Sequence, residues 1–547
     1  MPVEYLKDGD IKFIGLDSRD NPASLPQGIV SQSQNFRLDR GVATVRKGLQ
    51  RKTAFALVGQ TVYGSGAYID TTGQEILIIV VTNGLYTYNP QTEALVGKIN
   101  FPAGETIVTQ EGCDVVQAID KVFITRGFSK RPLLWDMTSG AGSITALPPT
   151  AGAGHQFPNC AGLLFYANRL IARGAHHAEQ VSYPNTLRNY DTVSVSNFLD
   201  YQEWAALDAF TINNGSNDQI VGIAPWTLNE FLVFMRNSIF YISVGNGRYA
   251  TSDALASDAI LRTMVSDLGC SAKRTIVQAN GGVVFLSDNG VYFLQPSQVG
   301  SNESTRLMSV ADPMSAPIDD VIQRINKSYS SRSVATYWNN RYYLAVPLDS
   351  SVDNNAILVY NFILNAWESV DVYPAGFDIM NFLIAKKDNQ RRMFGIDTDQ
   401  GIFLMEQLNW DEYGDATGYA VLPFYIPITL PATATFTPNA INATLVTRVY
   451  SFGASAVGEK RFSTAEVDLV ADAGSQVTTA INVLNPDVFE TIDTFGASTT
   501  EDSTRRNPIR KMGSGIQLQF STNNLRPSIR SAYVYAVQQT KQNQSKK

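Results

Sequence analysis

Histidine is scarce in this 547-residue chain, which contains only His155, His176 and His177. His176 and His177 are adjacent in a segment that also carries Glu179, so these three side chains could together hold a metal ion. Their spacing fits none of the usual zinc patterns, and no further ligand is evident. We therefore predict that the protein has no metal site and no bound cofactor.

The usual signatures of hydrolytic enzymes are also missing. There is no Gly-x-Ser-x-Gly segment that would present a nucleophilic serine at a strand-to-helix turn. Aspartates and glutamates are plentiful, but none lies in a context typical of the carboxylate pair of a glycosidase. Turns between strands explain the glycines at 245–247 and 281–282, so they predict no phosphate-binding loop. We predict no catalytic residues and no enzymatic activity.

Four aromatic residues could form a platform for stacking on sugar rings. They are Trp338, Tyr342, Tyr343 and Trp367, and they lie in strand-like segments. Aromatic side chains that alternate along strands also fill the space between packed sheets. We favour this second interpretation, in which the aromatic residues belong to the core.

A short phrase recurs four times and predicts the elements that organise the chain. It begins at Asn83, Asn237, Asn289 and Gln400, and continues with glycine or serine, an aliphatic residue and an aromatic residue. An apolar run precedes each copy. An Asn-Gly pair between such runs favours a type I′ turn, because both central positions of that turn need φ > 0. Each copy therefore predicts a β-hairpin.

The copies are spaced at multiples of one period. The distance from Asn237 to Asn289 is 52 residues, and the other two intervals are close to two and three times that length. A unit of roughly 50 residues is typical of propeller blades. We predict a β-propeller of about seven blades over residues 61–410, with a loop insertion near 174–217. The alternative is a set of unrelated hairpins in a β-sandwich.

The two ends of the chain differ from the repeats. Residues 1–60 predict an N-terminal arm and a hairpin. Residues 411–547 alternate between apolar and polar side chains in strand-like runs, which predicts a separate β-sandwich-like domain. The expected fold is therefore all-β: a propeller of about seven blades with loop insertions, followed by a C-terminal β domain.

The net charge of −7 is unevenly distributed. Residues 1–60 carry nine basic against six acidic side chains, and residues 501–547 carry nine against two, which leaves −17 between them. An acidic body disfavours gripping of nucleic acid. The basic ends could dock acidic protein partners, or they could simply be solvated.

The sequence also bears on location and redox state. We find no signal-peptide pattern at the start and no apolar stretch long enough to span a membrane, so a soluble protein made in the cytoplasm is expected. Cys113, Cys160 and Cys270 are odd in number and far apart, which predicts buried free thiols.

The segment from Asn35 to Gly48 resembles the opening of tail nozzle, or tail hub, proteins of short-tailed bacteriophages. This family includes tail tubular protein B and packaged-DNA stabilisation protein. The shared pattern is Asn-x-Arg-x-Asp-x-Gly followed by Arg-Lys-Gly, here at 35–41 and 46–48, with Lys47 in place of a common proline. The order of strand-like runs after residue 460 is similar to the C-terminal region of the same family.

The resemblance implies a structural subunit of the virion tail, made in the host cytoplasm. Such subunits form a homo-oligomeric ring, typically of six copies, below the portal and its adaptor ring, and they anchor tail fibres or tailspikes. The lumen retains the packaged genomic DNA and conducts it during ejection without sequence-specific binding. We hypothesise that the acidic middle of the chain lines this lumen, where it would repel the DNA backbone.

Two clusters are candidates for contacts between subunits or with the adaptor ring. One lies in the N-terminal hairpin and the other near the C-terminus. The candidates are Asn35, Arg37, Asp39, Arg40, Arg46, Lys47, Arg505, Arg506, Arg510 and Lys511.

Two other functions are compatible with a propeller. A carbohydrate-acting or carbohydrate-binding propeller predicts a carboxylate cluster and export from the cell. A WD-repeat-like scaffold predicts Gly-His and Trp-Asp signatures that recur from repeat to repeat, and in this sequence the signatures do not recur in that way.

Overall fold

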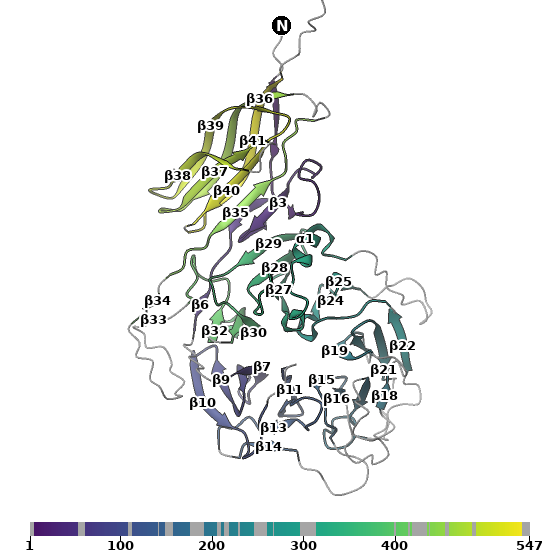
Figure 1. Ribbon diagram of the computed structural model, residues 1–547. Helices are drawn as coiled ribbons and strands as arrows, with labels where there is room; N and C mark the ends of the chain where they lie inside the picture. Colours follow the sequence, from purple (N-terminus) through teal and green to yellow (C-terminus); the bar gives the residue numbers. More distant parts are fainter. Residues whose placement is uncertain are drawn as a thin grey trace, which may run out of the picture.

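Within the described residues, seven blades of antiparallel strands lie in a ring in the computed structural model (Figure 1). The first strands of neighbouring blades contact one another around the axis, and between the fourth and fifth blades β19 (Ile220–Pro225) contacts the turn η1 (Lys273–Thr275) that precedes β23 (Val277–Ala279); this is the arrangement of a β-propeller. The predicted all-β fold with about seven blades is confirmed. The structure describes residues 5–52, 61–107, 112–140, 142–147, 157–174, 191–204, 209–212, 218–227, 230–244, 260–265, 267–295, 313–398, 401–413, 416–417, 435–436, 438–453, 459–483, 488–523 and 525–538.

Consecutive strands form local meanders in the first six blades, and in the seventh blade three consecutive strands do so. The strands of the first four blades are β7 (Val62–Ile69), β8 (Glu75–Val81), β9 (Gly84–Asn89), β10 (Ala94–Asn100); β11 (Val115–Ala118), β12 (Lys121–Ile124), β13 (Leu133–Trp135), β14 (Ile144–Ala146); β15 (Gly162–Tyr166), β16 (Arg169–Arg173), β17 (Thr192–Val195), β18 (Ala209–Thr211); and β19 (Ile220–Pro225), β20 (Glu230–Met235), β21 (Ile239–Ser243), β22 (Ile260–Val265). The remaining blades contain β23 (Val277–Ala279), β24 (Gly282–Ser287), β25 (Gly290–Leu294); β26 (Val334–Trp338), β27 (Arg341–Val346), β28 (Ala356–Asn361), β29 (Ala366–Val372); and β30 (Ile379–Lys387), β31 (Gln390–Asp397), β32 (Gly401–Leu404).

A strand from the start of the chain completes the seventh blade. This strand is β6 (Gln50–Arg51), and it pairs antiparallel with β32 at the outer edge of the blade. The first and seventh blades are neighbours, because β30 contacts β7. The ring is therefore closed by residues that precede the first blade.

The recurring phrase marks the second hairpin of a blade, but its turn differs from the prediction. Val81 pairs with Gly84, so the glycine begins β9 and the loop is formed by the two residues before it. A Cβ on Gly84 would lie 2.5 Å from the carbonyl oxygen of Ile99, so close packing of β10 explains the glycine. Gln400 lies outside the described residues. Pairs with φ > 0 occur instead in the first hairpins, at Ile119-Asp120, Ala167-Asn168, Asn280-Gly281, Asn339-Asn340 and Asp388-Asn389.

The expected insertion near 174–217 contains blade strands. Its described residues include β17 and β18, which pair with each other as the outer strands of the third blade. These strands are short and partly polar, so their hydrophobic pattern is weak. Residues 175–190 lie outside the described residues, and with them His176, His177 and Glu179; His155 does as well.

Both ends of the chain build a β-sandwich beside the propeller. One sheet has the strand order β39-β36-β41-β5-β4, with β1 also paired to β41, and the other has the order β3-β35-β40-β37-β38. Their bounds are β1 (Tyr5–Asp10), β3 (Ile29–Gln34), β4 (Phe36–Asp39), β5 (Val42–Val45), β35 (Ala443–Thr447), β36 (Lys460–Ala471), β37 (Gln476–Asn482), β38 (Glu490–Gly496), β39 (Glu501–Gly513), β40 (Gln517–Thr522) and β41 (Ser528–Gln538); β33 (Ala416–Thr417) and β34 (Thr435–Phe436) form a separate pair.

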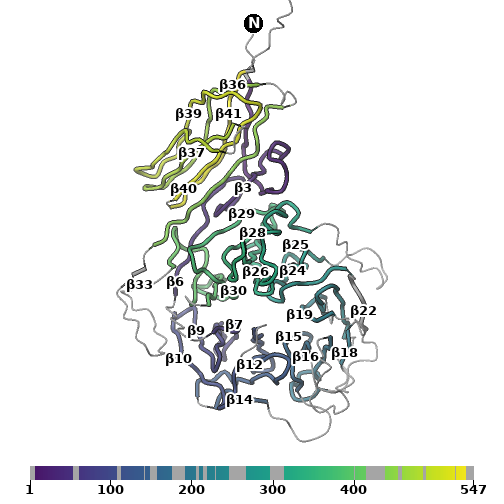
Figure 2. Tube along the Cα trace, viewed as in Figure 1, coloured from purple at the N-terminus to yellow at the C-terminus, as the bar shows by residue number. Residues whose placement is uncertain are grey.

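Residues 1–60 are not a separate arm, which corrects the predicted domain boundary. Strands β1, β3, β4 and β5 belong to the sandwich, and Figure 2 shows the N-terminal tube running among the C-terminal strands. Strand β2 (Gly15–Leu16) pairs with β3 and with β29 of the sixth blade. One ten-stranded sheet therefore runs from the propeller into the sandwich.

The largest hydrophobic core crosses the same boundary. It includes Phe462 and Phe520 of the sandwich, Tyr342 and Trp367 of the sixth blade, and the side chains around helix α1 (Asp319–Gln323). Tyr342, Tyr343 and Trp367 are at most 2% exposed, so their predicted place in the core is confirmed. Burial of each such side chain contributes roughly 1.5–3 kcal/mol to the free energy of unfolding.

Other short helical turns are η1 (Lys273–Thr275), η3 (Ala316–Ile318) and η4 (Ser330–Arg332). Among the described residues, no helix has the length and apolar character needed to cross a membrane.

Candidate functional site

The N-terminal hairpin places two arginines against the propeller. Arg37 lies on β4, and its guanidinium donates to both carboxylate oxygens of Asp371, at 2.9 and 2.6 Å, and also to Glu406. The Arg37 side chain is 8% exposed and Asp371 is fully buried. Burial alone would lower the pKa of Arg37, but the charges of Asp371 and Glu406 hold that pKa well above its ordinary value.

Arg46 forms a second buried ion pair beside the first. Its guanidinium donates to both oxygens of Asp411, at 2.9 and 2.8 Å, and its Nε donates to the Oδ1 of Asn35 at 2.9 Å. The guanidinium carbon also lies 4.0 Å from the centroid of the Tyr373 ring. Burial lowers the pKa of Arg46, but Tyr373 and Asp411 more than offset this, so the pKa is raised.

Asn35 connects the hairpin to the sixth blade. It adopts φ = 60°, and its Oδ1 also accepts a hydrogen bond from the backbone of Val372 at 2.9 Å. Asn35, Arg37 and Arg46 therefore join the sandwich to the propeller.

This arrangement corrects part of the predicted set of assembly contacts. Asn35, Arg37 and Arg46 are buried inside the chain, at 2%, 7% and 0% exposure, so they are not available to a second molecule. Their charge and polarity suggested a surface, but their acidic partners lie more than 300 positions further along the chain. Asp39, Arg40 and Lys47 are exposed and remain candidates.

The C-terminal candidates all lie on β39, an edge strand of the sandwich. Arg506, Arg510 and Lys511 are exposed and Arg505 is half-buried. Arg505, Arg506 and Lys511 form ion pairs with Asp493, Glu466 and Glu490. These pairs neutralise part of the predicted basic patch.

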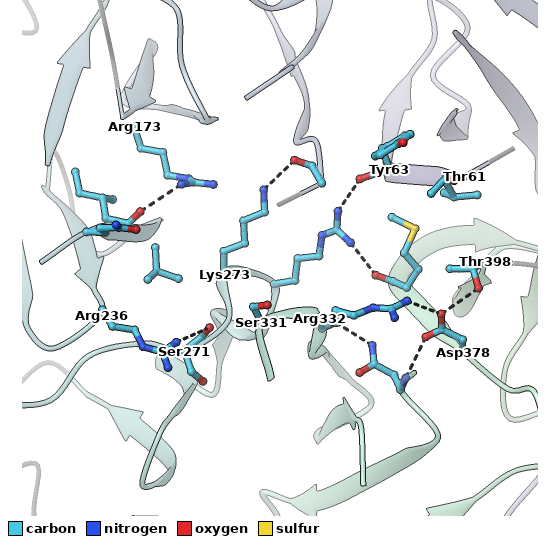
Figure 3. A pocket seen from close by; sticks show the side chains of 18 of the residues that line it. Thr61, Tyr63, Arg173, Arg236, Ser271, Lys273, Ser331, Arg332, Asp378 and Thr398 are labelled. Atoms are coloured by element: carbon cyan, nitrogen blue, oxygen red, sulfur yellow. Dashed lines mark hydrogen bonds and ion pairs between the residues drawn. The ribbon is translucent and has the colours of Figure 1, made fainter. Parts of the chain in front are cut away.

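The axis of the propeller is occupied by basic side chains (Figure 3). A cavity of about 880 Å³ opens there, and the turn η1 projects into it. Lys273 of η1 reaches Asp114 beside the second blade at 3.0 Å. Arg274 donates to the carbonyl oxygens of Tyr63 and Met380, at 2.9 and 3.1 Å, and so links the first and seventh blades.

Further cations line the same cavity. Arg332 pairs with Asp378 at 2.9 Å, and Arg173 donates to the carbonyl oxygen of Ile220 at 3.3 Å. Burial lowers the pKa of Lys273, and nearby Arg173 and Arg274 lower it further, although Asp114 acts in the opposite direction. Burial also lowers the pKa of Arg274. Five cationic side chains therefore line the axial cavity, against the carboxylates of Asp218 and Asp378.

The chemistry available in this cavity is electrostatic. Asp378 accepts hydrogen bonds from Thr398 and from the backbone of Asn354, as well as from Arg332, so its oxygens are occupied. Among the described residues, no cluster of three histidine, cysteine or carboxylate side chains could hold a metal ion. The geometry suits a cross-linked hub that joins blades across the axis.

Comparison with known proteins gives no family assignment. No protein-family model matches the chain. No curated protein matches it either. A BBS1N chain from the crystal structure of BBS1N in complex with ARL6DN, soaked with mercury, is similar, with 13% identity, 66% of this chain and 98% of that chain covered, and a TM-score of 0.39.

Two other solved structures are similar at the same level. The AfRom2 CNH domain has 9% identity, covers 66% of this chain and 97% of its own, and gives a TM-score of 0.33. A chain of the Mitotic Checkpoint Complex has 9% identity, covers 61% and 85%, and gives a TM-score of 0.36.

The basic side chains at the propeller axis were not predicted from the sequence. The local signal is Lys273-Arg274, two adjacent cations shortly before a strand and without an acidic residue beside them. The partners of these cations come from other blades, so the local sequence does not reveal that the cations meet at the propeller axis.

Proposed function

We propose that this chain is a structural subunit of the tail nozzle, or hub, of a short-tailed bacteriophage, without catalytic activity. It assembles with other copies into a ring, typically of six, below the portal and adaptor ring. The ring retains packaged DNA, conducts it during ejection and anchors tail fibres or tailspikes.

The observation that carries the proposal is the hairpin from Asn35 to Gly48. Its sequence resembles the opening of nozzle proteins, and the shared residues Asn35, Arg37 and Arg46 hold two domains together. A role in joining the sandwich to the propeller accounts for the two buried ion pairs, Arg37 with Asp371 and Arg46 with Asp411.

The side chains at the propeller axis affect where DNA could pass in such a ring. Lys273 extends across that axis (Figure 3) and reaches Asp114. Arg274 donates to the carbonyl oxygen of Tyr63 in the first blade, so side chains that connect blades obstruct the axis. A phosphate backbone would also bind these cations instead of sliding past them. In this proposal, the lumen therefore forms between copies of the chain.

Assembly provides the test. The chain is mixed with the cognate portal–adaptor assembly and examined by native mass spectrometry and cryo-electron microscopy, and we expect a ring of six copies on the adaptor. A chain that stays monomeric in the presence of the assembly would contradict the proposal.

A charge-reversed variant tests the contact surface at the same time. Arg506→Glu with Arg510→Glu should impair ring formation if β39 lies at a contact, because both side chains are exposed. Arg324→Glu is a control for charge reversal away from β39, since Arg324 is exposed and paired with exposed Asp349.

The carbohydrate-directed alternative gains no support from the aromatic residues. Tyr342, Tyr343 and Trp367 are buried and cannot stack on a sugar ring. Binding or hydrolysis on a panel of glycans would favour that alternative.

A further inference from the structure

A second cavity lies where the sandwich meets the propeller. It has a volume of about 700 Å³ and is separate from the axial cavity. Its walls come from the N-terminal hairpin, from the loop before β41, and from the sixth and seventh blades. We call it the junction cleft.

The junction cleft is strongly basic. Six cationic side chains line it against two carboxylates, which are Asp39 and Glu406. The cations are Arg37, Lys47, Arg341, Arg391, Arg392 and Arg526.

Three of these cations are neutralised within the chain. Arg37 is paired with Asp371 and Glu406, Arg341 with Glu368, and Arg391 with Glu75. These pairs hold the walls of the cleft in place.

The other three cations have no such partner. Among the described residues, no carboxylate lies within ion-pair distance of Lys47, Arg392 or Arg526. Arg526 is half-buried and donates its Nε to the carbonyl oxygen of Val45 at 2.8 Å. Burial lowers its pKa, as expected for a cation that lacks a counter-charge in contact.

We propose that the junction cleft binds an acidic polypeptide segment of a partner protein. Carboxylate side chains of that segment would pair with Lys47, Arg392 and Arg526. This inference does not rest on the proposed function, because it follows from the charges of a single chain.

The size and surroundings of the cleft favour a polypeptide over nucleic acid. A cavity of this volume is within the range of ~300–1,000 Å³ that encloses small ligands, so it holds a few side chains and not a duplex. Guanidinium groups match carboxylates in geometry. The net charge of −7 repels a long polyanion, whereas a short segment experiences mainly the local field.

The apolar part of the wall supports the same choice. Trp338 is half-buried beside the cations, and its indole nitrogen donates to the carbonyl oxygen of Arg391 at 3.1 Å. Trp338 can pack against the stem of a glutamate. Tyr337 and Tyr343 also line the cleft, but Tyr343 is only 2% exposed and the Tyr337 ring packs against Phe362, so the cleft offers no row of open faces for stacked bases.

The test uses the full chain and a short fluorescein-labelled oligoglutamate peptide. Binding is measured by fluorescence anisotropy at low salt, with an uncharged oligoglutamine peptide as the reference ligand. We expect binding of the acidic peptide alone, accompanied by a change in tryptophan emission from Trp338 that is lost in Trp338→Phe.

A double variant then locates the site. Lys47→Glu with Arg392→Glu should weaken binding about tenfold or more, because two attractive contacts become repulsive. The control, Arg510→Glu with Lys511→Glu, changes the net charge equally on the exposed face of β39 and should change the affinity by less than about twofold. Thermal unfolding of both variants establishes that they are folded.

Three results would overturn the proposal. They are the absence of peptide binding to the wild-type chain, equal loss of binding in both double variants, or tighter binding of a single-stranded oligonucleotide of the same charge at this cleft. Ring assembly does not enter the measurement, so its outcome is independent of the nozzle proposal.

Discussion

Arg46 and Asp411 are 365 positions apart in the chain, yet they meet through two hydrogen bonds of 2.9 and 2.8 Å. Both side chains are almost fully buried, at 0% and 2% exposure. Arg46 lies shortly before β6, the strand that completes the seventh blade, and Asp411 lies shortly after β32 of the same blade. The strength of this ion pair therefore bears on the stability of both domains.

Asp411→Asn should strongly destabilise the chain. The amide keeps the shape of the side chain but leaves the Arg46 charge buried and uncompensated, which lowers the free energy of unfolding by about 3–5 kcal/mol. Urea denaturation followed by tryptophan fluorescence measures the change. Asp502→Asn breaks the exposed pair with Arg530 and should cost less than about 1 kcal/mol. Equal losses in the two variants would refute the assigned role.

Arg274→Met should loosen the propeller at its axis with little effect on global stability. The variant removes two hydrogen bonds that link the first and seventh blades, but it also removes the cost of burying a cation. These effects are opposed, so the free energy of unfolding should change by no more than about 1–2 kcal/mol. Hydrogen exchange of peptides from β7 and β30 should become faster.

The matched control for this prediction is Arg236→Met. Arg236 lines the same cavity, but its side chain is 40% exposed and paired with Asp288. Its removal should leave exchange in β7 and β30 unchanged. Unaltered exchange in Arg274→Met would show that the cross-axis bonds do not hold the blades together.

The three cysteines should be inert in the folded chain. Cys113, Cys160 and Cys270 are free and buried, and burial raises the pKa of Cys113 and of Cys270 from 9.0 to about 12. A thiol reagent at pH 8 should label none of them rapidly in the native state and all three in denaturant. Rapid labelling of one native thiol would contradict this burial.

The raised pKa values of Cys113 and Cys270 also predict how the free energy of unfolding changes at alkaline pH. The unfolded chain releases these protons at lower pH than the folded chain does. Stability is therefore unaffected by these thiols below pH 9 and decreases as the pH rises from 9 towards about 12. Replacing Cys113 and Cys270 by alanine should flatten that part of the pH profile measured by urea denaturation.

Ala167→Gly should stabilise the chain. Ala167 adopts φ = 50° in the first hairpin of the third blade, a conformation that costs an alanine about 1–2 kcal/mol and a glycine almost nothing. The free energy of unfolding should rise by about 1 kcal/mol. Ala94→Gly, on the exposed face of β10, should instead lower it by about 0.5–1 kcal/mol. A loss of stability in Ala167→Gly would contradict the assigned turn strain.

The propeller could be predicted from the sequence because its hairpins are local. Each phrase places two strands within a few residues of each other, and runs such as Glu75–Val81 alternate or remain apolar as buried strands do. The buried stripe of Ile318, Val321 and Ile322 is a local pattern of the same kind, and it accompanies the short helix over Asp319–Gln323.

The sandwich and the junction depend on partners that local patterns do not encode. The alternation around Phe36 indicates a strand, but it does not show that β5 of the same hairpin pairs with β41 at Ser528 and Ile529. Likewise, Arg37 has the character of a surface residue until Asp371 is placed beside it. The turn at Ile119-Asp120 contains no glycine, so its residue types do not indicate that both residues adopt a positive φ.

The closing strand β6 also sets an order of events during synthesis. Gln50 and Arg51 leave the ribosome early, but their partners on β32 follow about 350 residues later, which corresponds to roughly 20–70 s at typical translation rates. During that interval the propeller cannot close, because β6 has already been synthesised but its partner strand β32 has not. A chaperone that binds this N-terminal segment should therefore raise the yield of folded protein. Faster translation initiation, which places more ribosomes on each messenger RNA, should favour pairing of β6 with β32 of a neighbouring chain.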